Sequence, residues 1–139
     1  MWGNKAANGT TPAYESLKHF MPSIIWAAFV LWLSLSPQRG FPRWDLPHLD
    51  KIVHFICYFI LAALMYFGRV RKSTASFRPL PVIITLFLIA LVYGLSIEVL
   101  QEALTADRHF SWLDETANAA GAFTGLVVMQ LLGRRAISF

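Results

Sequence analysis

The residues best suited to chemistry lie at the edges of the long apolar stretches of this chain. Asp50, Lys51 and His54 share one helical turn at the start of the second stretch. A larger set ends the third stretch and opens the fourth: Glu98, Gln101, Arg108, Asp114 and Asn118. Ionisable groups at such positions are costly in a bilayer and often mark functional sites. Together they would suit the binding of a polar group, and Glu98 with His54 would be eligible as acid and base.

Other kinds of chemistry find little support in the sequence. No metal site and no cofactor are expected, because none of these residues forms a recognised metal-binding signature. The sequence contains no nucleophile elbow, phosphate loop or paired-cysteine motif. Cys57 is the single cysteine and lies in an apolar stretch, where a buried thiol is the expected role. Whether the protein is an enzyme therefore stays open at this point.

The elements that must position these residues follow from composition. Of the 139 residues, 56% are hydrophobic and 14% are charged, which is too apolar for a solvated globule of this size. The net charge of +4 comes from short basic clusters between apolar runs, which act as orientation signals, so no nucleic-acid partner is expected. The composition predicts an integral membrane protein whose first contacts are membrane lipids.

Four stretches are long enough to cross a bilayer, which predicts an all-α polytopic bundle of four transmembrane helices. Their expected bounds are about Phe20–Ser36, Pro47–Gly68, Leu80–Leu100 and Thr116–Leu132. Pro22 is expected in the first turn of the first helix, and Asp45 is expected to cap the second. The first stretch also resembles a signal peptide, but the polar leader before it is long, so an uncleaved anchor is expected. The domain organisation is then a tail over 1–19, a membrane domain over 20–133 and a tail over 134–139.

The fourth stretch is the least hydrophobic and is rich in small residues. Gly121 and Gly125 form a G-x-x-x-G pair, which predicts that this helix approaches its neighbours closely. The same face is a candidate contact for a membrane-protein partner, as in a structural subunit of a larger complex.

Lysine and arginine counts predict the orientation. With an internal N-terminus, the cytoplasmic segments hold eight of these residues and the outer ones hold four, so both termini are expected in the cytoplasm. Seven of the eight acidic residues then lie outside or at the outer boundary. About 18 residues separate Leu80 from Glu98, roughly 27 Å of helix, so Glu98 is expected just inside that outer boundary.

These polar residues also carry a family resemblance. Four segments resemble those of VanZ-like membrane proteins. They are Asp50-Lys51-Ile52-Val53-His54, Glu98-Val99-Leu100-Gln101, the segment from Arg108 to Asp114, and Ala117-Asn118-Ala119-Ala120-Gly121. The resemblance runs from about Leu33 to Leu132. It implies a four-helix bacterial protein of the inner membrane, in a family whose founding member is linked to low-level resistance to the glycopeptide teicoplanin. It implies no reaction. Ala106-Asp107 departs from the Pro-Gly type of turn that often precedes the arginine in this family.

The sequence leaves several interpretations open. Each residue also has a purely structural interpretation. Asp114 lies three residues after Ser111, the spacing of a capping box, and would then only cap the fourth helix. Asn118 would hydrogen-bond to a neighbouring helix, and Lys51 would extend to lipid headgroups. The main hypothesis is a polar site at the extracytoplasmic face that recognises or protects a cell-envelope component or a glycopeptide. The alternatives are a membrane enzyme acting on a lipid-linked envelope molecule and a structural subunit.

Overall fold

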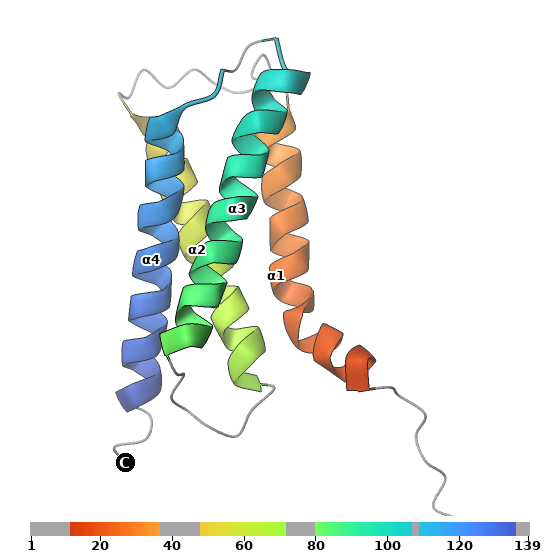
Figure 1. Ribbon diagram of the computed structural model, residues 1–139, viewed down its shortest axis with the longest axis vertical. Coiled ribbons are helices and arrows are strands. Elements are labelled where there is room, and N and C mark those ends of the chain that lie inside the picture. Colours follow the sequence, from red (N-terminus) through yellow and green to blue (C-terminus); the bar gives the residue numbers. More distant parts are fainter. Residues whose placement is uncertain (1–11, 37–47, 72–79, 107–108, 136–139) are drawn as a thin grey trace, which may run out of the picture.

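The computed structural model describes residues 12–36, 48–71, 80–106 and 109–135. These residues form four antiparallel helices in an up-and-down bundle (Figure 1): α1 (Pro12–Leu35), α2 (Leu49–Arg71), α3 (Leu80–Leu104) and α4 (Trp112–Arg135). No strand occurs in these ranges. All four helices are long and apolar enough to span a membrane. The predicted all-α fold with four spans is therefore confirmed.

The helices extend beyond the apolar stretches that predicted them. α1 begins at Pro12 instead of Phe20, so that Pro22 lies inside the helix and not in its first turn. Proline has no backbone N–H and disrupts the preceding turn, and the N-terminal part of α1 bends away from the bundle (Figure 1). α4 likewise begins at Trp112, four residues before the predicted start at Thr116. Hydropathy marks where a helix is apolar, whereas backbone hydrogen bonding continues into its polar ends. Asp45, the expected cap of α2, lies outside the described residues.

α2 packs most extensively against α4. At Gly121 the two backbones approach so closely that an added Cβ would collide with the Phe55 carbonyl oxygen, and at Gly125 an added Cβ would lie 2.6 Å from the Phe59 carbonyl oxygen. The G-x-x-x-G pair thus works as predicted for close packing, and the helix that it contacts is α2 of the same chain.

The core of the bundle lies mainly on α2, with contributions from each of the other helices. Tyr58, Ala62 and Tyr66 of α2 are at most 2% exposed. Large apolar side chains are exposed all around the bundle, including Ile25, Val92 and Phe123. Such a distribution would be unfavourable in water and is suited to lipid tails.

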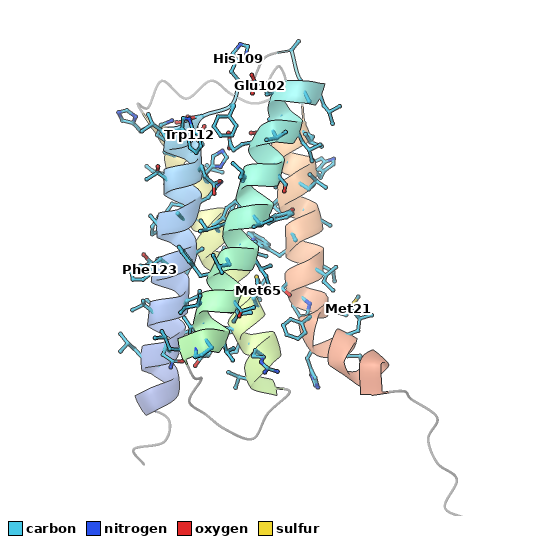
Figure 2. All side chains as sticks on the ribbon, in the orientation of Figure 1. Met21, Met65, Glu102, His109, Trp112 and Phe123 are labelled. Atoms are coloured by element: carbon cyan, nitrogen blue, oxygen red, sulfur yellow. The ribbon has the colours of Figure 1, made fainter. Side chains whose placement is uncertain are left out.

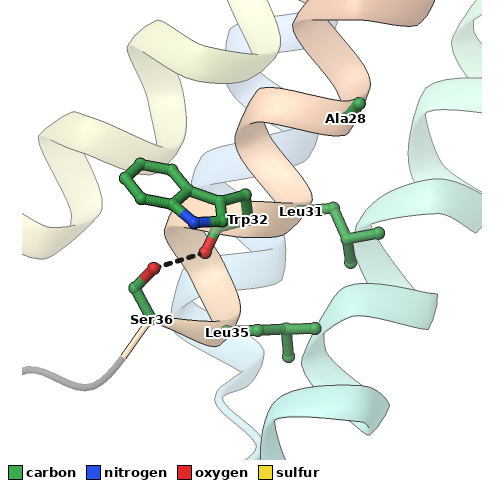
Figure 3. Close-up of a pocket in the computed structure, with 5 residues that line it drawn as sticks. All are labelled: Ala28, Leu31, Trp32, Leu35 and Ser36. Atoms are coloured by element: carbon green, nitrogen blue, oxygen red, sulfur yellow. Dashed lines mark hydrogen bonds between the residues drawn. The ribbon is translucent and has the colours of Figure 1, made fainter.

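α1 is tied to the other helices by side chains that donate to backbone carbonyls. The Trp26 indole donates to the Cys57 carbonyl of α2 at 2.9 Å, and the Tyr93 hydroxyl of α3 donates to the Ala27 carbonyl. A shallow groove on α1 is lined by its own residues (Figure 3): Ala28, Leu31, Trp32, Leu35 and Ser36. None of the predicted site residues lines this groove.

Candidate functional site

The site lies where α3 ends and α2 and α4 begin, which we call the site end. Ser111 precedes α4, and its hydroxyl accepts a hydrogen bond from the Asp114 amide at 3.3 Å, as a helix N-cap does. In a capping box the Asp114 carboxylate would return to the Ser111 amide. The Glu98 carboxylate of α3 takes this bond instead, at 3.1 Å. Glu98 therefore joins α3 to the start of α4, and the Asp114 side chain is available for another contact.

That contact is with Lys51 of α2. The Lys51 ammonium lies 2.9 Å from Asp114 Oδ1 and 2.8 Å from Asp50 Oδ2. Asp114 and Lys51 are partly buried, with side chains 17% and 26% exposed, whereas the Asp50 side chain is 56% exposed. Lys51 thus connects α2 to α4 at the rim of the site instead of extending freely to lipid headgroups.

His54 lies one turn deeper and links the three helices. Its Nδ1 is 3.0 Å from the Asn118 amide oxygen of α4 and 4.0 Å from Glu98 Oε1 of α3. The Asn118 amide nitrogen donates to Glu115 Oε2 at 3.1 Å, so the amide oxygen is the atom that faces the imidazole. His54 Nδ1–H then donates to Asn118, and the lone pair of the neutral ring lies on Nε2.

Glu115 is a member of this site that the sequence analysis did not select. Its carboxylate packs against α3 at Gly94, where an added Cβ would lie 2.6 Å from Glu115 Oε2. It also interacts electrostatically with Glu98 and His54. From the sequence alone, an acid in the first turn of a helix is explained by its favourable interaction with the helix dipole. The spacing to Asn118, three residues further on, was the signal that would have identified it.

Tyr58 closes the site from below, one turn deeper than His54. The side chain is 1% exposed, and its hydroxyl makes no hydrogen bond to any described residue. The hydroxyl interacts electrostatically with Tyr93, Glu115 and Glu98. A buried hydroxyl in a folded protein normally has a polar partner, so this group marks a polar location inside the bundle.

The structure brings most of the predicted site residues together. We define the polar cluster as Lys51, His54, Glu98, Asp114, Glu115 and Asn118. Asp50 contacts it at the exposed edge through Lys51. Gln101 turns toward α1 and donates to the Ser34 carbonyl at 3.0 Å, which makes it a link between helices. Arg108 lies outside the described residues. Figure 2 shows Glu102, His109 and Trp112 at this same end of the molecule.

Glu115 changes the charge balance of the site end. Asp50, Glu98, Asp114 and Glu115 carry four negative charges, and Lys51 is the one formal cation opposite them among the described residues. Within the polar cluster itself, three carboxylates (Glu98, Asp114 and Glu115) and the Lys51 ammonium give a formal net charge of −2. Such a field attracts cationic or zwitterionic groups and disfavours a bare phosphate.

The sequence matches one family model, described as VanZ/LLP1, over residues 5–133. No curated protein and no solved structure matches the chain. The match covers α1, α2 and α3, all of α4 except its last two residues, and every residue of the polar cluster. The chain is therefore a multi-pass membrane protein that belongs to the VanZ/LLP1 family.

Proposed function

We propose that this protein recognises a polar component of the cell envelope, such as a lipid-linked precursor or a glycopeptide, at the polar cluster. The observation that carries the proposal is the convergence of α2, α3 and α4 on one group of hydrogen-bonded and charged side chains. His54, Glu98 and Asn118 are contributed by three different helices and lie within 4.0 Å of their neighbours in the cluster. Charged groups are expensive at membrane depth, and ionisable groups that persist there commonly mark functional sites.

The proposal places the polar cluster at the extracytoplasmic face of the bacterial inner membrane. The supporting feature is the distribution of lysine and arginine, which favours the opposite end of the bundle for the cytoplasm by eight to four. An envelope component would then reach the site end from the extracytoplasmic side of the membrane. Protection against a glycopeptide antibiotic would follow if the protein bound the antibiotic or its target there.

The test is mass spectrometry of lipids that copurify with the full chain. We compare the wild type with Glu98→Gln, which keeps the shape of the side chain and removes its charge. Glu102→Gln is the matched control, because Glu102 lies one turn further along the same helix and is exposed. We expect one lipid species to be depleted in Glu98→Gln and retained in Glu102→Gln.

Susceptibility to teicoplanin in cells expressing the same variants tests the glycopeptide branch of the proposal. Expression and monodispersity are checked first, so that loss of fold is separated from loss of binding. If folded Glu98→Gln retains the same lipids and the same susceptibility as the wild type, the proposed function is wrong. The polar cluster would then serve to hold the helices together.

A second candidate is a membrane enzyme acting on a lipid-linked envelope molecule. The feature that favours it is the contact between His54 and Glu98, an eligible base and acid 4.0 Å apart. Turnover of a lipid-linked substrate by the wild type, lost in His54→Gln while lipid retention persists, would favour the enzyme over the binding protein. The structural-subunit alternative would need another surface than the Gly121/Gly125 pair, which contacts α2.

A further inference from the structure

We propose that the polar cluster binds a divalent metal ion through His54, Glu98 and Asp114. The inference rests on the proposed function in taking the cluster for a ligand site, and it adds the identity of one ligand. It departs from the sequence analysis, which expected no metal. The three residues lie 44 and 16 positions apart in sequence and carry no local signature, so that only the fold brings them together.

The geometry of the three donors is the first argument. One ligand atom from each residue lies within 4.8 Å of the other two, and each residue comes from a different helix. Donors around Zn²⁺ are separated by roughly 3.3 Å when the bonds are about 2.0–2.1 Å long. Side-chain rotations that move each ligand atom by about 1 Å would therefore let all three atoms bind one ion. An imidazole with two carboxylates is a donor set used for Zn²⁺ and other divalent metals of the first row.

The surroundings of His54 resemble those of a metal-binding histidine. Asn118 holds the imidazole through its amide oxygen, and Glu115 holds the Asn118 amide nitrogen. Chains of this kind, which end on a carboxylate, orient histidine ligands and increase their basicity. The packing of Glu115 against Gly94 keeps the end of this chain in place.

The Tyr58 hydroxyl supplies an independent observation. It is buried, has no hydrogen-bond partner among the residues described here, and interacts electrostatically with Glu98 and Glu115. Buried polar groups of this kind in native proteins call for a partner such as water or an ion. A water molecule bound to the metal would provide one at this depth.

Charge favours a divalent ion over a monovalent one. The polar cluster holds three carboxylates and one ammonium, a formal net charge of −2, so one divalent ion would neutralise it. Lys51 donates to the Oδ1 atom of Asp114, and within the described part of the chain Oδ2 would remain as a donor to the ion. Burial of uncompensated charge is costly, and bringing the net charge to zero removes that cost.

Zn²⁺ and Co²⁺ binding to the purified full chain tests the inference. The protein is held in detergent or nanodiscs, with any polyhistidine tag removed, and is titrated by calorimetry and by the visible absorption of Co²⁺. We expect one ion per chain in the wild type. His54→Gln, Glu98→Gln and Asp114→Asn should each weaken binding by at least about tenfold.

His109→Gln and Glu102→Gln are the matched controls, because both residues are exposed at the site end and lie outside the cluster. Their affinity should stay within about twofold of the wild type. X-ray absorption of the Zn²⁺-loaded wild type gives a measurement that does not depend on the folding of any variant. We expect nitrogen and oxygen donors at about 2.0–2.1 Å and scattering from a single imidazole.

Two results would overturn the inference: no ion bound by the wild type, or equal binding by the cluster variants and the two controls. If the wild type binds ethanolamine and neither metal, the first of these results holds and the negative charge is assigned to an amine. Metal binding is measured without any envelope component. If the ion binds but Glu98→Gln leaves lipid retention and susceptibility unchanged, the metal site stands and the proposed function fails.

Discussion

At the residue scale, the site end depends on pairs of side chains that belong to different helices. The Lys51–Asp114 ion pair joins α2 to α4, and the partial burial of both partners keeps it from being fully screened. The Lys51–Asp50 pair has the same chemistry but joins neighbours in sequence and is more exposed. These two pairs share one ammonium, so they can be compared directly.

We predict that Lys51 and Asp114 are coupled energetically. Lys51→Met and Asp114→Asn should each lower the free energy of unfolding by about 1–3 kcal/mol, and the double variant should lose less than the sum by about 0.5–3 kcal/mol. The cycle of Lys51→Met with Asp50→Asn is the control and should show less than about 1 kcal/mol. Unfolding in mixed micelles provides the measurement. Equal coupling in the two cycles would contradict a special role for the pair between helices.

We also predict that Gly94 is required because of Glu115. In an exposed helix Gly→Ala would be favourable by about 1 kcal/mol, but at Gly94 the new Cβ would collide with the Glu115 carboxylate. Gly94→Ala should therefore destabilise the protein by about 1–3 kcal/mol. In a Glu115→Ala background the loss should be clearly smaller, because the close neighbour that remains is the Asn118 amide nitrogen, 3.1 Å from the new Cβ. A similar loss in both backgrounds would show that Glu115 does not limit the space at Gly94.

Residue types and spacing identified most of the side chains that meet at the site end, but not their pairing. His54 and Asn118 were both selected from the sequence, yet their contact depends on how α2 and α4 are rotated against each other. Glu115 was missed because an acid in the first turn of a helix has an ordinary explanation. The Ser111 amide donates to Glu98, and Asp114 accepts a hydrogen bond from Lys51 instead of from Ser111; both contacts depend on tertiary packing. Local capping rules alone would have assigned that bond to Asp114.

At the element scale, the packing of α2 on α4 sets the position of the site. Gly121 and Gly125 bring the two helices together at the level of Phe55 and Phe59, directly below the polar cluster. The small residues that predicted close packing were recognisable in the sequence, because helices in a membrane associate through close backbone contact, which small side chains allow. The partner helix was not recognisable, since any of the other three would have satisfied the motif. Helix ends were underestimated where polar residues continue a helix beyond its apolar part, as at Trp112.

We predict that Gly121→Ala lowers the thermal unfolding midpoint in detergent, at a cost of about 1–3 kcal/mol, because the added methyl group would lie against the Phe55 backbone. Gly121→Leu should be more damaging. Val127→Leu is the control on the same helix, because Val127 is 38% exposed and its side chain has room to grow. Midpoints for Gly121→Ala and Val127→Leu that agree would exclude a tight contact at Gly121.

At the scale of the whole molecule, five of the six lysine and arginine residues in the described ranges lie at the end of the bundle opposite the polar cluster, and Lys51 is the sixth. We predict that a cysteine replacing Ala106, at the site end, reacts with an impermeant thiol reagent in intact cells. A cysteine replacing Ser73, in the segment between α2 and α3, should not react. Both are placed in a Cys57→Ala background, which removes the buried native thiol. Labelling of Ser73→Cys alone would invert the orientation that the proposed function requires.

The preference of α2 for α4 also has a consequence for how the protein is made. α2 enters the membrane before α3 and α4, but its largest contact is with the last of the four helices. Until α4 is synthesised and inserted, Lys51 and His54 have neither Asp114 nor Asn118 beside them. The nascent chain must therefore hold these polar side chains near the insertion machinery or the headgroup layer. Ribosome stalling before α4, or slow insertion of that helix, would leave a three-helix intermediate that membrane quality control can recognise.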